Sequence, residues 1–231
     1  MRKALRSRAF DEEPLRFSVQ VRRMARMALV LIIRLMETSC SGPPIDDNAI
    51  LERLPAEISA FLRRQNGLIA AHGCLHVRGA CIAPAWHSIR SAWEGEFALH
   101  HLYPGALLSS VPLAEDCFGD QYLLRDGLVI RLVGETGDIE PMECDWPEFL
   151  ANVEADPVEY LHLGFLDRFR EQSGPLAPCH LIHAYPPFVT VEGRNPSLRA
   201  IPALELRSFH ADFARQIRDI PDGTKMEVKI V

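Results

Sequence analysis

The stretch from Val111 to Met142 constrains the fold of this chain more than any other segment. Two apolar runs, Tyr122–Leu124 and Leu128–Val133, flank Arg125-Asp126-Gly127. Asp-Gly between two strand-like runs is a strong hairpin signal, because the tight turn needs positive φ and glycine adopts it without a steric penalty. A second turn signal, Glu135-Thr136-Gly137-Asp138, follows directly. The sequence therefore predicts an antiparallel meander.

Helical patterns surround this meander on both sides. Apolar residues recur every three or four positions in Pro55–Gln65 and most clearly in Ala203–Ile220, as is typical of amphipathic helices. Further predicted elements are the helix Ala49–Leu54, a helix with Trp86, Ile89 and Trp93 on one stripe, two helices that begin after Asp145 and Asp156, an edge strand or loop at Pro186-Pro187, and strands at His72–Val77 and Lys225–Val231. Helices around a central antiparallel sheet predict one α+β domain over residues 45–231.

The charge of the chain is divided unevenly between its two parts. Residues 1–44 hold nine basic and four acidic side chains, whereas residues 45–231 hold 16 basic and 27 acidic ones, a net charge of -11. An acidic body repels nucleic-acid phosphates and favours basic protein partners. The charge therefore argues against a nucleic-acid-binding protein.

Residues 1–44 are interpreted as a disordered or loosely helical basic tail, or as the result of a translation start placed too early, before Met27 or Met36. The apolar run Met27–Ile33 is too short for a membrane span, which needs about 20 apolar residues. Arg34 also ends this run early for a secretion signal. Six scattered cysteines indicate a reducing compartment and no disulfide framework. We therefore expect a cytoplasmic protein without a membrane span.

Three carboxylates, Glu115, Asp116 and Asp120, stand at the start of the meander. Paired carboxylates can perform acid–base chemistry or hold Mg²⁺. Aspartate beside glycine is also ordinary turn chemistry, and no neighbouring lysine, histidine or glycine-rich phosphate loop completes a catalytic site. We therefore assign these carboxylates to an acidic partner-binding surface and predict no catalytic residue.

Four competent zinc ligands, His72, Cys74, His76 and Cys81, lie close together in the sequence. Their spacing matches no standard ligand pair, and a strand would need a further ligand from elsewhere. The favoured interpretation is a strand with two polar-facing histidines and a buried Cys74, with zinc binding as the alternative. No dinucleotide fingerprint, Walker loop or nucleophile elbow is present, so no cofactor is predicted.

The order of several motifs resembles the SUKH superfamily over about residues 47–165. These motifs are a Leu54-Pro55-Ala56-Glu57 helix start, a helix end at Asn66-Gly67, the Pro112–Asp116 and Gly119–Tyr122 corner, the meander, and a helix that starts at Glu148-Phe149-Leu150. The superfamily includes fungal cell-wall-synthesis regulators of the Smi/Knr type and bacterial toxin-immunity proteins.

The resemblance implies an antiparallel sheet flanked by helices and a binding role without a catalytic site. For bacterial members the implied role is to bind and neutralise a toxin, and the acidic body independently suits a basic one. A regulatory scaffold of the Smi/Knr type is the alternative, and a metal-dependent enzyme that uses Glu115, Asp116 and Asp120 is a further one. The identity of the partner, the binding face and the oligomeric state stay open at this point.

Overall fold

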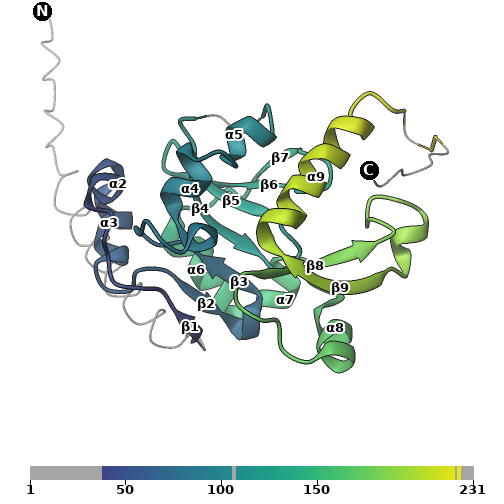
Figure 1. The fold of residues 1–231 in the computed structure, drawn as a ribbon, viewed down its shortest axis with the longest axis horizontal. Helices are drawn as coiled ribbons and strands as arrows, with labels where there is room; N and C mark the ends of the chain where they lie inside the picture. The colour runs from purple at the N-terminus through teal and green to yellow at the C-terminus, as the bar shows by residue number, and fades with distance from the viewer. Residues whose placement is uncertain (1–37, 106–107, 222, 225–231) are drawn as a thin grey trace, which may run out of the picture.

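The computed structural model describes residues 38–105, 108–221 and 223–224 (Figure 1). Its centre is a seven-stranded antiparallel sheet in which every strand pairs with its neighbours in sequence, in the order β1 to β7. The strands are β1 Thr38–Ser41, β2 Leu68–Ala70, β3 Leu75–Val77, β4 Val111–Asp116, β5 Gln121–Arg125, β6 Leu128–Leu132 and β7 Ile139–Pro141. The predicted α+β class and the central meander are therefore confirmed.

Short helices connect and cover this sheet. They are α2 Asn48–Arg53, α3 Ala56–Leu62, α4 Ile89–Glu94, α5 Leu99–Leu102, α6 Trp146–Ala155, α7 Pro157–Tyr160, α8 Leu166–Ser173 and α9 Ala203–Ile217, with 3₁₀ turns at Ala71–Gly73, Ala85–His87 and Glu192–Arg194. A separate two-stranded sheet pairs β8 His180–Tyr185 with β9 Ser197–Pro202. It is joined to the corner between β4 and β5, because the Ile182 amide donates to the Cys117 carbonyl at 2.7 Å. No helix in the described ranges is long and apolar enough to cross a membrane.

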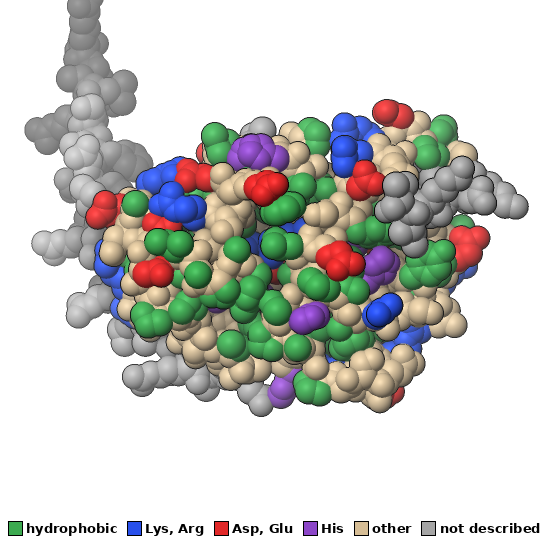
Figure 2. All heavy atoms as spheres, in the orientation of Figure 1, with side chains coloured by type: hydrophobic (Ala, Val, Ile, Leu, Met, Phe, Trp, Pro, Cys, Tyr) green, Lys and Arg blue, Asp and Glu red, His purple; other side chains and the backbone are tan. Residues whose placement is uncertain are grey.

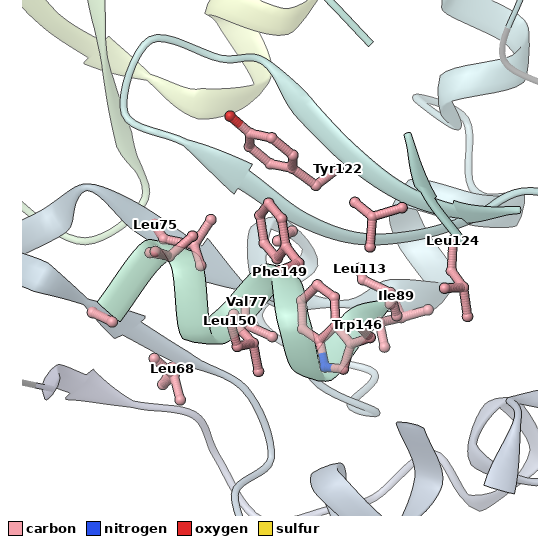
Figure 3. Close-up of a cluster of buried hydrophobic side chains, with 14 of the residues drawn as sticks. Leu68, Leu75, Val77, Ile89, Leu113, Tyr122, Leu124, Trp146, Phe149 and Leu150 are labelled. Carbon is pink, nitrogen blue, oxygen red and sulfur yellow. The ribbon is translucent and has the colours of Figure 1, made fainter. Parts of the chain in front are cut away.

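The larger part of the core lies between the sheet and α6. Trp146 and Phe149 of α6 stack at 5.4 Å between ring centroids, and Phe149 contacts Tyr122 of β5 at 4.8 Å (Figure 3). The helix begins where the sequence predicts, because the Asp145 side chain accepts a hydrogen bond from the Glu148 amide at 2.9 Å. Local capping thus sets the start of the helix that covers this face.

A second, smaller cluster lies on the other face of the sheet. Strand alternation sends Leu123 and Leu132 to this side, where Ala211 and Ala214 of α9 pack against them. In Figure 1, α9 runs across the front of the sheet while α6 lies behind it. The C-terminal helix is therefore an integral layer of the domain, and its burial fixes β8 and β9 beside the sheet.

Three local predictions need revision. Thr38–Ser41 was assigned to the tail, but these residues pair with β2, so the folded part starts earlier than residue 45. His72–Val77 is not one strand, because His72 adopts a φ of 55° in a 3₁₀ turn between β2 and β3. Ser88 is extended and caps α4, so Trp86 and Trp93 do not share a helix stripe. The predicted strand at 225–231 and residues 1–37 of the tail lie outside the described residues.

Candidate functional site

Glu115 of β4 is the centre of a buried network of charges. It is 1% exposed and accepts two hydrogen bonds from Arg207 of α9, from Nε and from Nη2, each of 2.8 Å. Arg78 donates from Nη2 at 2.9 Å, and Gln121 donates from Nε2 at 3.1 Å. His76 Nδ1 lies 2.9 Å from Oε1, the oxygen that also accepts from Arg207 Nη2. The carboxylate therefore joins β3, β4 and β5 to the C-terminal helix.

The two arginines decide the ionisation of this carboxyl group. Burial alone would raise the pKa of Glu115, but the charges of Arg207 and Arg78 hold it well below its usual range. Arg78 is 0% exposed and also donates to the Ala114 carbonyl at 3.1 Å. Such a group is costly to bury alone and is retained only because its partners are buried with it. The network therefore holds the fold together and leaves Glu115 unavailable to a partner.

A chain of hydrogen bonds leads from Glu115 through two histidines. His76 Nε2 lies 2.8 Å from His87 Nδ1, and His87 Nε2 lies 3.0 Å from the backbone oxygen of Asn66. Both ends of this chain are acceptors, so three hydrogen bonds would need three protons, whereas two neutral imidazoles carry only two. Burial lowers the pKa of His76 to about 4, against the opposing effect of Glu115. At neutral pH one of the three contacts therefore lacks its proton.

The His87 ring occupies a space that glycines from three segments leave open. A Cβ atom built on Gly42, Gly67 or Gly79 would lie 2.3, 2.6 or 2.9 Å from ring atoms of His87. On the open side Trp86 lies 4.9 Å from His76 and 5.3 Å from His87 between ring centroids. A cavity of about 20 Å³ remains beside His76 and Trp86, enough for roughly one water molecule.

The other two predicted carboxylates belong to a different group. Asp116 follows Glu115 on the strand and faces the opposite side of the sheet, where its Oδ2 accepts from the Tyr122 hydroxyl at 3.0 Å. Its Oδ1 accepts from the amides of Phe118 at 2.9 Å and Asp120 at 3.2 Å, which closes the corner at Gly119. This is the turn chemistry that the sequence favoured.

The assignment of these carboxylates to an exposed acidic surface is therefore wrong for two of them. Glu115 and Asp116 are each 1% exposed. Asp120 is half-buried, accepts from the Gly134 amide at 2.7 Å and from Arg131 Nε at 2.8 Å, and is thus also engaged within the fold. Because Glu115 and Asp116 point to opposite faces, the three residues do not form one metal-binding cluster either.

The four potential zinc ligands do not converge. His72 is exposed, whereas Cys74 and Cys81 are buried, and both ring nitrogens of His76 are engaged in the network. Within the described ranges no three His, Cys, Asp or Glu side chains are placed to hold a metal ion. Burial raises the pKa of the Cys74 and Cys81 thiols, which favours their uncharged form.

A second cavity, of about 280 Å³, lies beside the corner between β4 and β5. Asp116, Asp120, Arg131 and Glu135 line it together with apolar side chains that include Phe118 and Phe188. Glu135 accepts from the amides of Phe188 at 3.0 Å and Val189 at 2.9 Å, which ties the loop after β8 to the turn before β7. Burial raises the pKa of Glu135.

The exposed acidic surface lies elsewhere, on the segment that follows β6. Between Arg131 and Arg168 the sequence holds ten acidic residues and no lysine or arginine. Seven of them are exposed on or beside β7, α6 and α7, and we call them the acidic rim: Asp138, Glu140, Glu143, Asp145, Glu148, Asp156 and Glu159.

Among the described residues, Glu140 is the rim member that forms an ion pair, with Arg131 at 3.5 Å. By contrast, the face in Figure 2 shows acidic and basic side chains interspersed around a largely apolar middle. Carboxylates beside glycine do not mark this surface, whereas the long interval without a basic residue does, and that signal is present in the sequence.

The fold and these sites define an α+β domain with a closed internal charge network, a lined cavity and an acidic rim. No protein-family model and no curated protein matches the chain. Among solved structures, the crystal structure of Atu4351 from Agrobacterium tumefaciens is similar, with a TM-score of 0.48 and 16% sequence identity. The match covers 75% of this chain and 85% of that one.

Proposed function

We propose that this chain is a non-catalytic, SUKH-like binding protein that recognises a basic protein and neutralises it as an immunity protein neutralises a toxin. The observation that carries the proposal is the acidic rim. Its carboxylates project into solvent from adjoining elements, and the segment supplies no lysine or arginine to compensate them. A surface of one sign raises the rate of encounter with a partner of the opposite sign and disfavours like-charged competitors.

The internal network supports a binding role over a catalytic one. Glu115 is enclosed by Arg207, Arg78 and His76, so its charge stabilises the fold. Asp116 is likewise occupied by backbone amides and a tyrosine hydroxyl. The carboxylates best placed for chemistry by sequence are thus engaged within the fold, whereas the seven carboxylates of the rim are open to solvent. All six cysteines are free thiols, which supports a cytoplasmic location.

The test is binding to a toxin encoded beside the gene, measured by calorimetry and by survival on co-expression. We expect the triple variant Glu143→Lys/Glu148→Lys/Glu159→Lys to weaken binding by about 100-fold or more, since charge complementarity is reversed at three sites. The matched control is Glu52→Lys/Glu171→Lys/Glu192→Lys, which makes the same change of net charge on exposed residues outside the rim.

The control variant should bind as the wild type does. Equal weakening by both triple variants would show that net charge alone matters and would remove the rim as the binding face. Unchanged survival of cells against every neighbouring toxin would overturn the immunity role.

A further inference from the structure

We propose that the 280 Å³ cavity beside the β4–β5 corner receives an arginine side chain of the partner. The inference rests on the proposed function, because it assumes a basic protein partner, and it identifies the group that the partner inserts. Small-molecule sites usually enclose about 300–1,000 Å³. A cavity of this size lies just below that range and suits a single long side chain.

The cavity wall holds more acidic than basic side chains. Three carboxylates, those of Asp116, Asp120 and Glu135, face one arginine, Arg131. Arg131 is already engaged by Asp120 at 2.8 Å and by Glu140 at 3.5 Å. Burial raises the pKa of Asp116 well above its usual value, and the charge of Asp120 raises it further. A raised pKa favours the uncharged form of Asp116, and a second cation in the cavity would favour its ionised form instead.

Glu135 keeps acceptor positions after its two backbone hydrogen bonds are made. Each oxygen of Glu135 accepts one backbone amide, whereas a carboxylate offers about four acceptor positions in all. A planar guanidinium presents five N–H donors in a fixed fork, which matches carboxylates that converge on one space. An ammonium group has three donors and no flat face, so it would satisfy this wall less completely.

Aromatic side chains form part of the cavity wall. Phe118 and Phe188 pack edge to face at 5.1 Å and an interplanar angle of 88°, and Phe188 stacks on Phe165 at 5.3 Å. At the far end of this row Arg168 already lies over Phe165, with Cζ 4.7 Å from the ring centroid. The chain thus shows the arginine–aromatic contact that the cavity would repeat.

The test uses the full chain and N-acetyl-arginine amide as the probe, with binding followed by NMR chemical shifts. We expect saturable binding with shifts at Phe118, Glu135 and Phe188, and no binding of the neutral isostere N-acetyl-citrulline amide. N-acetyl-lysine amide should bind about tenfold more weakly, because it cannot stack or form a planar fork. The proposal would be overturned if the citrulline compound bound as tightly as the arginine compound, or if none of the three compounds bound.

Two substitutions locate the binding. Val189 lines the cavity and is 49% exposed, so Val189→Lys should place an ammonium group at the cavity and abolish binding of the probe. The control, Val191→Lys, lies two residues further on, is 70% exposed and is not part of the wall, so it should leave binding unchanged. Glu135→Gln should weaken binding about tenfold, since it removes one charge from the wall. If Val189→Lys and Val191→Lys reduce binding of the probe equally, the cavity is not the binding site.

The two proposals fail separately. A partner that binds through the rim and binds Val189→Lys as well as the wild type would refute the cavity proposal alone. Specific capture of the arginine probe together with indifference to every basic toxin would refute the proposed function alone.

Discussion

Arg207 of α9 donates two hydrogen bonds of 2.8 Å to Glu115 of β4, which lies 92 positions away in the sequence. The pair is buried at both ends, since the Arg207 side chain is 3% exposed and that of Glu115 is 1% exposed. This polar contact accompanies the apolar packing of α9 against the sheet. Because the two contacts occur on one face, the C-terminal helix cannot leave the sheet without exposing both apolar surface and charge.

Removal of one partner of this pair should strongly destabilise the fold. Arg207→Met should lower the free energy of unfolding by about 3–5 kcal/mol, because Glu115 then loses a buried counter-charge. Urea denaturation followed by circular dichroism measures the change. Arg215→Ala on the same helix is the control, since Arg215 is an exposed ion-pair partner and should cost less than about 1 kcal/mol.

The double variant Arg207→Met/Glu115→Gln separates charge from packing. If charge balance decides the loss, the double variant should be less stable than Arg207→Met alone, because buried Arg78 then lacks its carboxylate partner. A double variant as stable as Arg207→Met would show that packing of the arginine stem is the dominant contribution.

The histidine chain should make stability depend on pH in the acidic range. The folded-state pKa of His76 is about 4, below the ordinary value of 6.5, so the unfolded chain takes up the proton first as pH falls. Stability is therefore full above pH 6.5 and is lost between pH 6.5 and 4, by about 3 kcal/mol at 1.36 kcal/mol per pH unit. Buried His210, with a pKa lowered to about 3, acts in the same direction.

Asp116 acts in the opposite direction, because its folded-state pKa is raised and its protonated form is stabilised as pH falls. The comparison of wild type with His76→Gln isolates the histidine contribution. Urea midpoints between pH 7.5 and 4 should fall less steeply in the variant, and parallel curves would contradict the assignment.

The position of the missing proton is directly observable, and we expect it to be missing from the His76–His87 link. Long-range ¹H–¹⁵N spectra at pH 7 should show His76 protonated at Nδ1 and His87 protonated at Nε2. His76 Nε2 and His87 Nδ1, which lie 2.8 Å apart, should both show the shift of an unprotonated ring nitrogen. A third ring proton shared between these nitrogens would instead mean that the pair is cationic at neutral pH.

The glycine beside His87 should be required for close approach as well as for its backbone angle. Gly67 has a φ of +75° and Gly127 a φ of +82°, so alanine would take a positive φ at either position. A Cβ at Gly67 would lie 2.6 Å from the His87 ring, whereas nothing lies within 4 Å at Gly127. Gly67→Ala should therefore destabilise the protein by at least about 2 kcal/mol more than Gly127→Ala. Equal thermal midpoints for the two variants would rule out the steric contribution.

Sequence reasoning succeeded where the controlling interaction is local. The turn at Asp126-Gly127 has φ angles of 52° and 82°, as a primed hairpin turn requires, and both residues are adjacent in the chain. The cap at Asp145 acts three residues away on the Glu148 amide. Such signals can be read directly from a short window of sequence, which is why the meander and the start of α6 were predictable.

The candidate sites depend on contacts that no short window contains. Glu115 looks like an exposed turn residue until Arg207 and Arg78 are placed against it, at separations of 92 and 37 residues. His72–Val77 alternates like a strand, but the positive φ of His72 turns the chain and leaves only β3 paired with β4. Burial and long-range pairing thus decide which carboxylates remain available at the surface.

The position of the acidic rim at β7 has a consequence for the assembly of the chain. β7 is the last strand of the sheet, so one side of it offers backbone groups that another strand could pair with. A second copy that approached this edge would bring its carboxylates, such as Glu140 and Glu143, close to the same carboxylates of the first copy. Self-repulsion therefore protects the sheet from edge-to-edge aggregation, while the same edge remains attractive to a strand rich in lysine and arginine.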